Sequence, residues 1–231
     1  MKLDKDYYSK EYFVGGARGN YVNYSNHPTN KALINLILRN CKKQGVLLEI
    51  ACAYGFFLKE AENYFETYGV DISEYAIDKA RKITNKTKLI NGNIIDIIPN
   101  LKEKFDIIVA LDVLEHLPDP KNIIETCYNL LKEDSYFIFR IPNKSSLYLR
   151  YLTMFNDKSI WSGFKDKSHI SLYPLDKWKY LLTSQGFKFK MYPSIPTIFL
   201  KKMIIKINPR FYFLPQRFHV LNDSIVFICK K

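Results

Sequence analysis

The chain has 231 residues, of which 47% are hydrophobic and 25% charged, a composition ordinary for one folded domain. It excludes a disordered or low-complexity protein, and no internal repeat is present. The four cysteines form no C-x-x-C pair, which argues against a disulfide framework and against a zinc site. The first residues mix acids and bases without the apolar run of a signal peptide, so we expect a cytoplasmic protein.

The net charge of +12 is concentrated in the last third of the chain. Residues 1–150 hold 21 Lys and Arg against 19 Asp and Glu, whereas residues 151–231 hold 14 against 4. This excess suits an anionic acceptor or peripheral contact with a membrane surface, and it equally suits lysines that are only solvated. No basic run of the kind that binds nucleic acid is present, so we do not expect a nucleic-acid partner.

Residues 1–45 form a first unit, with an aromatic segment followed by a helix. Six Tyr and Phe side chains fall within residues 1–28, and such a segment either packs on the domain surface or covers a ligand pocket as a lid. Thr29 or Asn30 can cap a helix, which we expect to shield the sheet edge beside the first strand.

Residues 46–71 hold the pattern around which the chain is organised. A short apolar run at 46–50 is followed by a loop of small residues at 51–55, a helical stretch at 56–65 and a second strand at 68–71. Small residues let backbone N–H groups approach a ligand, and Asp71 stands where an acid can hold a ribose diol. The pattern predicts the front half of a nucleotide-binding βαβ unit.

Strands and helices continue to alternate beyond this unit. We predict strands at 88–90, 105–111, 136–141, 187–192 and 224–229, with helices at 73–83, after Asp119, and between Pro174 and Gly186. Periodicity fades at 143–168, where we place an aromatic insertion over the site. The alternation indicates an α/β fold with a doubly wound, mostly parallel sheet.

The order of five segments carries a family resemblance. LLEIACAYGFFLKEA, YGVDIS, LINGNIIDI, FDIIVALDVLEHLPDP and YFIFRIPN resemble the class I S-adenosylmethionine-dependent methyltransferases, closest to the branch of ubiquinone-biosynthesis and glycan O-methyltransferases. The resemblance is strong over residues 46–142 and looser over 169–190. It implies an enzyme that uses S-adenosylmethionine, with a seven-stranded Rossmann-like sheet, helices on both faces and an antiparallel final strand. Residues 46–231 would then form the methyltransferase domain.

The resemblance also implies which residues bind the cofactor. The expected contacts are Glu49 near the methionine amine, Ala51, Cys52, Ala53 and Gly55 under the methionine and ribose, Asp71 on the ribose, Ile72, Asn93 and Ile94 around the adenine, and Leu111 through its backbone. Two of the three glycines usual in this loop are alanine here. The added methyl is tolerable at negative φ and costly at positive φ, and Gly55 should be the least replaceable position.

Methyl transfer needs no metal in principle, and we predict none. The alternative is a divalent cation on Asp112, Glu115 and His116, a spacing that resembles metal-binding ubiquinone-pathway relatives. The candidate general base is His169, which follows the insertion, with a purely structural role as the alternative.

The predicted function is O-methylation of a small molecule, sugar or lipid-linked intermediate. No N/D-P-P-Y sequence follows the fourth strand, which favours oxygen over nitrogen as the acceptor atom. The alternatives are a tRNA or protein methyltransferase and a non-catalytic cofactor-binding module. The enzymatic interpretation fails if Tyr54 or Phe56 fills the pocket, or if Asp71 points away from it.

Overall fold

The computed structural model describes residues 6–16, 19–25, 28–97, 101–144, 146, 168–194, 213 and 224–231. The insertion predicted at 143–168 therefore lies almost wholly outside the described residues. Within the part of the chain that is described, no helix combines the length and the apolar character needed to cross a membrane.

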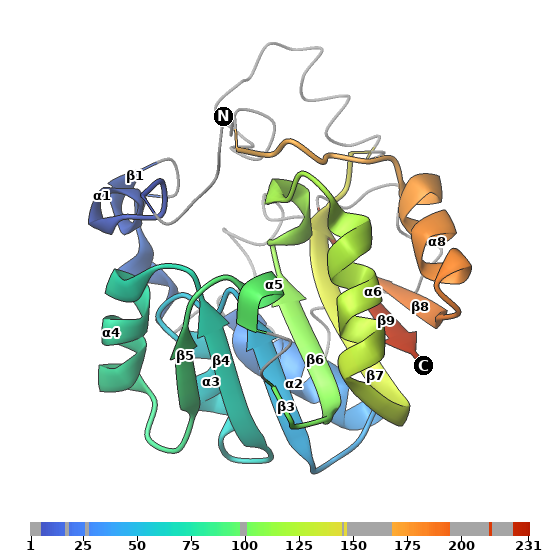
Figure 1. Ribbon diagram of the computed structural model, residues 1–231, viewed down its shortest axis with the longest axis horizontal. Coiled ribbons are helices and arrows are strands. Elements are labelled where there is room, and N and C mark those ends of the chain that lie inside the picture. The colour runs from blue at the N-terminus through green and yellow to red at the C-terminus, as the bar shows by residue number, and fades with distance from the viewer. Residues whose placement is uncertain are drawn as a thin grey trace.

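A seven-stranded sheet forms the centre of the molecule, with the strand order β5-β4-β3-β6-β7-β9-β8 (Figure 1). Its strands are β3 (Val46–Ile50), β4 (Glu66–Asp71), β5 (Lys88–Asn91), β6 (Phe105–Leu111), β7 (Leu131–Pro142), β8 (Lys188–Pro193) and β9 (Ser224–Lys230). The pairs from β5 to β7 are parallel, whereas β9 runs antiparallel to both β7 and β8. The predicted mostly parallel sheet with an antiparallel final strand is confirmed.

Helices cover both faces of the sheet, as predicted (Figure 1). They are α2 (Pro28–Asn40), α3 (Phe56–Ala61), α4 (Glu74–Ile83), α5 (Ile94–Ile97), the short 3-10 helix η3 (Leu114–His116), α6 (Pro120–Leu130) and α8 (Leu175–Ser184). α6 and α8 pack on one face, and α2 and α3 on the other. The expectation that the first of these helices shields an edge is wrong, because β3 is a central strand and α2 covers a face.

A small N-terminal arm precedes α2. It contains α1 (Lys10–Phe13), β1 (Val14–Gly16), β2 (Gly19–Asn20) and the 3-10 helix η1 (Tyr21–Tyr24). β1 and β2 pair as an antiparallel hairpin outside the main sheet. In Figure 1 this arm lies above α4, beside the carboxyl ends of the parallel strands.

Local signals set most helix boundaries. The hydroxyl of Ser73 accepts a hydrogen bond from the backbone of Ala76 at the start of α4. Asp119 accepts from the backbone N–H of Lys121 at the start of α6, where Pro120 occupies the first turn. Gly186 has φ +97° and lets the chain leave α8.

Two boundaries differ from the predictions by four residues or more, whereas β4 begins two residues earlier than predicted and α2 begins at Pro28, ahead of the predicted caps Thr29 and Asn30. The helix expected at 56–65 ends at Ala61, since Glu62 turns its carboxylate towards the backbone N–H groups of the loop that follows α4. β7 begins at Leu131, which pairs with Phe105, and not at residue 136. Residues 132–134 are polar and exposed, so the apolar pattern of the sequence did not reveal this first part of the strand.

Candidate active site

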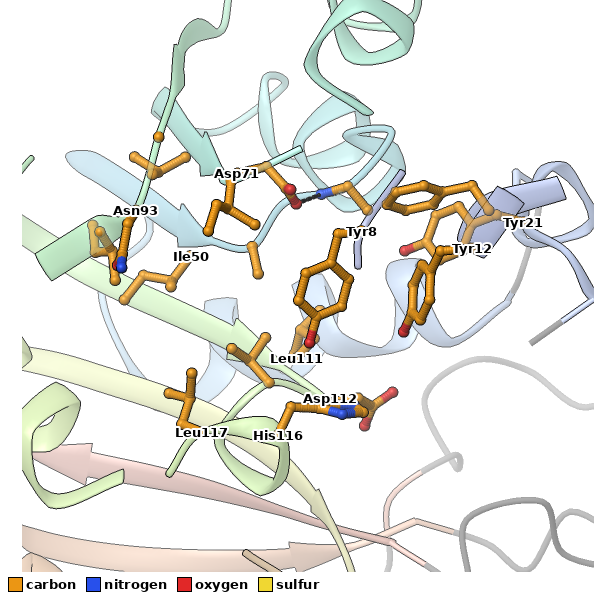
Figure 2. A pocket seen from close by; sticks show the side chains of 18 of the residues that line it. Tyr8, Tyr12, Tyr21, Ile50, Asp71, Asn93, Leu111, Asp112, His116 and Leu117 are labelled. Carbon is orange, nitrogen blue, oxygen red and sulfur yellow. Dashed lines mark hydrogen bonds between the residues drawn. The ribbon is translucent and has the colours of Figure 1, made fainter. Parts of the chain in front are cut away.

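One pocket lies at the carboxyl ends of β3, β4 and β6, where ligands bind in open α/β sheets. The space within it that admits the centre of a water molecule measures about 170 Å³. Its walls are formed by Tyr8, Tyr12, Phe13, Tyr21, Ile50, Ala51, Ala53, Val70, Asp71, Ile72, Gly92, Asn93, Ile94, Leu111, Asp112, Val113, His116, Leu117 and Pro118. Figure 2 shows Asn93 at one end of the pocket, His116 and Asp112 at the other, and Asp71 between them.

The loop after β3 uses left-handed backbone at three positions. Ala51 has φ +55° and Ala53 φ +48°, and both line the pocket. These are the positions where the resembling family has glycine, so each added methyl stands where it is costly. Gly55, at φ +72°, lies outside the pocket lining, and an added Cβ would come within 3.0 Å of the Thr84 side chain. Gly55 therefore serves the close packing of α3 against α4.

Cys52 also lies outside the pocket lining. Its backbone N–H donates to the carbonyl of Val70, and its buried side chain packs in the core on the α2 and α3 face. An added Cβ on Gly69 would come within 2.9 Å of the Cys52 sulfur. Of the four loop residues expected at the cofactor, only Ala51 and Ala53 face the pocket.

Asp71 ends β4 with its carboxylate at the pocket wall. Oδ2 accepts from the backbone of Ala53 at 2.8 Å, and Oδ1 accepts from the backbone of Ser73 at 2.8 Å (Figure 2). Burial raises the pKa of Asp71 to about 6, although these two N–H groups oppose the rise. The carboxylate is thus held by the loop it faces, and each oxygen keeps a second lone pair for a ligand hydroxyl.

Ile72, Asn93, Ile94 and Leu111 all line the pocket. The side-chain carbonyl of Asn93 accepts a hydrogen bond from the backbone of Ile95 at 3.0 Å. Asn93 therefore caps the start of α5. Its carbonyl oxygen has one lone pair left to accept a hydrogen bond from an adenine amino group.

Glu49 lies on β3 behind the lining and is only 5% exposed. Its Oε2 has no hydrogen-bond partner among the described residues. Burial raises the pKa of Glu49 well above its ordinary value, Asp71 raises it further, and Arg140 opposes the rise. A buried carboxylate needs a cationic or donor partner, so this orphaned oxygen fits the ammonium group of the expected cofactor.

The N-terminal arm supplies an aromatic wall of the pocket through Tyr8, Tyr12, Phe13 and Tyr21. Phe13 stacks on the buried ring of Tyr54 with centroids 5.2 Å apart, and Tyr21 meets the same ring at 5.0 Å.

The Tyr54 ring thus packs against the N-terminal arm. Neither Tyr54 nor Phe56 lines the pocket. Asp71 does line it, so neither condition that would defeat the enzymatic interpretation is met.

His116 is the imidazole that faces the pocket. Its Nδ1 lies 2.9 Å from the Ser168 hydroxyl and 3.2 Å from the Ser168 carbonyl, which fixes the ring. The ring of His169 packs against that of His116 with centroids 4.6 Å apart, and His169 is not part of the pocket lining. The structure thus places His116 where the sequence pointed to His169. One feature of the sequence could have indicated His116: it follows the fourth predicted strand, whose carboxyl end lies at the pocket.

The alternative metal set is not brought together. Asp112 turns to Arg140, whose Nε and Nη2 donate to its two carboxylate oxygens at 2.8 and 2.6 Å. Glu115, His116 and His169 instead have side-chain donor atoms within 4.8 Å of one another. Two imidazoles and a carboxylate are donors that a divalent cation accepts, but Asp112 is not among them.

A family model described as a methyltransferase domain matches residues 24–190. The chain belongs to the methyltransferase-domain family. Its sheet order, its loop after β3 and its acid at the end of β4 are those of the class I S-adenosylmethionine-dependent methyltransferases.

Curated relatives of this methyltransferase domain include two ubiquinone biosynthesis O-methyltransferases. The protein of Actinobacillus pleuropneumoniae serotype 7 is 32% identical over 108 residues, which cover 43% of this chain and 46% of the relative. The Coxiella burnetii protein of strain Dugway 5J108-111 is 32% identical over 103 residues, covering 43% and 44%. The match thus spans less than half the length of these relatives.

Solved methyltransferases share the fold over nearly the whole chain. A S-adenosylmethionine-dependent methyltransferase from Archaeoglobus fulgidus has a TM-score of 0.65 at 21% identity and covers 96% of this chain and 97% of its own. Magnesium protoporphyrin IX methyltransferase from Synechocystis, crystallised with S-adenosylhomocysteine (SAH), has a TM-score of 0.65 at 17% identity and covers 99% and 100%.

Proposed function

We propose that the chain transfers the methyl group of S-adenosylmethionine to a hydroxyl oxygen of a small molecule, a sugar or a lipid-linked intermediate. The observation that carries the proposal is the continuous pocket, which joins Asp71 and the alanine loop to the aromatic arm and His116. The bound cofactor would supply an activated methyl group. The protein then has to hold the acceptor oxygen in line with that group and exclude water.

The described residues divide these tasks along the pocket. Asp71 offers two carboxylate oxygens to a ribose diol, and Glu49 offers a buried carboxylate to an ammonium group. At the other end, His116 lies among the arm tyrosines and apolar side chains, where an acceptor hydroxyl would be placed. Tyr8 and Tyr12 line the pocket on the side of the N-terminal arm, with Tyr8 between Asp71 and Asp112 in the view of Figure 2.

The names of the curated relatives support oxygen as the acceptor atom. An anionic acceptor or membrane contact rests on the basic last third, much of which lies outside the described residues. No Lys or Arg occurs in the described pocket lining, so any such contact would be made beyond it. All four cysteines are free thiols, which supports a cytoplasmic location.

Two measurements test the proposal. Calorimetry should detect binding of SAH, and methyl-labelled S-adenosylmethionine should label hydroxyl acceptors from an extract of small molecules. Asp71→Asn should weaken binding, whereas Asp78→Asn, on the exposed face of α4, should leave it unchanged. A folded wild-type protein that gives no heat with SAH would refute the proposal.

A further inference from the structure

Arg140 lies near the carboxyl end of β7 and forms an ion pair with Asp112, which lines the pocket. Its Nε and Nη2 form the bidentate pair described above, and its backbone carbonyl accepts from the backbone N–H of Asp112 at 3.1 Å. Asp112 has φ +55°, a left-handed conformation that costs a non-glycine residue free energy. Backbone and side-chain contacts from Arg140 therefore help to hold Asp112 in this left-handed conformation, with its carboxylate at the pocket.

The same guanidinium lies on the face of the sheet that carries Glu49. Leu47, Val109 and Ile138 belong to one core cluster beside α2 and α3. Side chains two residues apart on a strand point to the same face, which places Glu49, Leu111 and Arg140 on that side. Glu49 is registered with Val109, and Leu111 with Arg140, so Arg140 lies two strands across from Glu49 and nearer the carboxyl edge.

Three carboxylates meet at this edge of the sheet, on Glu49, Asp71 and Asp112. Glu49 and Asp71 are buried, and the described pocket lining contains no Lys or Arg. Arg140 supplies positive charge just behind that lining, and its pair with Asp112 is itself largely buried, with 21% and 24% of the two side chains exposed. Burial favours the protonated form of such acids, and the charge of Arg140 opposes this at Glu49.

We propose that Arg140 is a positioning residue for both ends of the pocket: it fixes the Asp112 carboxylate at the acceptor wall and, from the same face of the sheet, supplies a positive charge that helps Glu49 ionise when the cofactor amine binds. The Glu49 half rests on the proposed function, because the partner of Glu49 is a cationic group of the cofactor. The Asp112 half rests on the contacts alone.

The first test is calorimetric titration with SAH between pH 7 and 9. Asp71, with a pKa of about 6, is already ionised there, and burial raises the pKa of the neighbouring Cys52 thiol well above its ordinary value. The amino group of SAH also titrates near this range. Its titration is common to all variants, so each variant is compared with wild type at the same pH. Arg140→Met should raise the Kd at pH 7 by about tenfold, because Glu49 loses the charge that favours its ionised form. The loss relative to wild type should shrink as the pH rises, since higher pH itself favours the ionised form of Glu49.

Two variants sharpen this test. Arg140→Lys keeps the charge and should restore the affinity to within about threefold of wild type, although it loses the bidentate geometry. Lys132→Met is the matched control. It removes another cation of β7, one whose carboxylate partner is Asp106, and should leave SAH affinity unchanged. Glu49→Gln should weaken SAH binding, and adding Arg140→Met to it should cost nothing more at any pH of the range.

The second test needs no ligand. Melting temperatures of Asp112→Asn, Arg140→Met and the double variant should be non-additive, with the double variant losing less than the sum of the single losses. Additive losses would overturn the Asp112 half. An Arg140→Met protein that binds SAH like wild type from pH 7 to 9 would overturn the Glu49 half. If Arg140→Met does not fold, Arg140→Lys is used in its place, and a loss of SAH affinity that does not change with pH in that variant would overturn the Glu49 half. A wild-type protein that does not bind SAH refutes the proposed function instead, and the melting cycle still decides the Asp112 half.

Discussion

Ala51→Gly should stabilise the protein. At φ +55° an alanine pays about 1–2 kcal/mol relative to its preferred backbone, and glycine removes this strain. Glycine also gives the unfolded chain more freedom, which costs about 0.4–1 kcal/mol. Ala51 is exposed, so no packing is lost. The balance is a gain of about 0.5–1 kcal/mol in the free energy of unfolding, or about 2–4 °C in melting temperature for each kcal/mol in a chain of this size.

Two neighbouring substitutions serve as internal controls. Ala53 has a similar φ of +48° but is buried among Phe13, Tyr54 and Ala76. Ala53→Gly should therefore be nearly neutral, because losing the buried methyl costs about 0.8 kcal/mol. Gly55→Ala should cost about 1 kcal/mol or more, since it adds left-handed strain and a contact of 3.0 Å with Thr84.

Urea unfolding of the three variants measures these differences directly. The expected order of stability is Ala51→Gly above wild type, Ala53→Gly close to wild type, and Gly55→Ala below it. An Ala51→Gly protein less stable than wild type would refute the reasoning, because the loop would then store no left-handed strain. A stabilising Gly55→Ala would show that α3 and α4 do not need their close approach.

Further predictions concern the pocket. The affinity for SAH should fall by about tenfold or more from pH 7 to pH 5 as Asp71, with a pKa of about 6, takes up a proton. The loss should be smaller in Asp71→Asn, and a flat wild-type profile would contradict the prediction. His116→Asn should slow methyl transfer by about 10²–10⁴-fold and leave SAH affinity unchanged, in an assay that contains EDTA throughout. His169→Asn should slow the transfer less, because His169 does not line the pocket. Equal losses in the two variants would contradict this assignment. Phe13→Ala should free the arm from Tyr54, so that chymotrypsin cleaves residues 6–25 faster while the sheet survives; an unchanged cleavage rate would show that the stack does not hold the arm.

The sequence predicted the sheet and one end of the pocket well, because both depend on local signals. Strand and helix periods, the caps at Ser73 and Asp119 and the acid at the end of β4 act within a few residues of one another. Asp71, Ala51 and Ala53 accordingly line the same pocket.

The other end of the pocket could not be derived in the same way. Asp112 and Arg140 meet only through the register of β6 and β7, and no local pattern reveals that pairing. The choice between His116 and His169 depends on which ring faces the cavity, a matter of side-chain direction. Alanine normally signals negative φ, so residue type alone hid the left-handed backbone at Ala51.

The central position of β9 between β7 and β8 has a consequence for synthesis. Among the described strands, β8 hydrogen-bonds to the main sheet only through β9, which begins at Ser224, well after β8 ends at Pro193. A nascent chain that has released β8 from the ribosome therefore carries an unpaired strand, and β7 also exposes one edge, until β9 emerges and inserts between them. Translational pauses in the segment between these strands should prolong this aggregation-prone stage, and chains stalled before Ser224 should depend on chaperones more than completed ones.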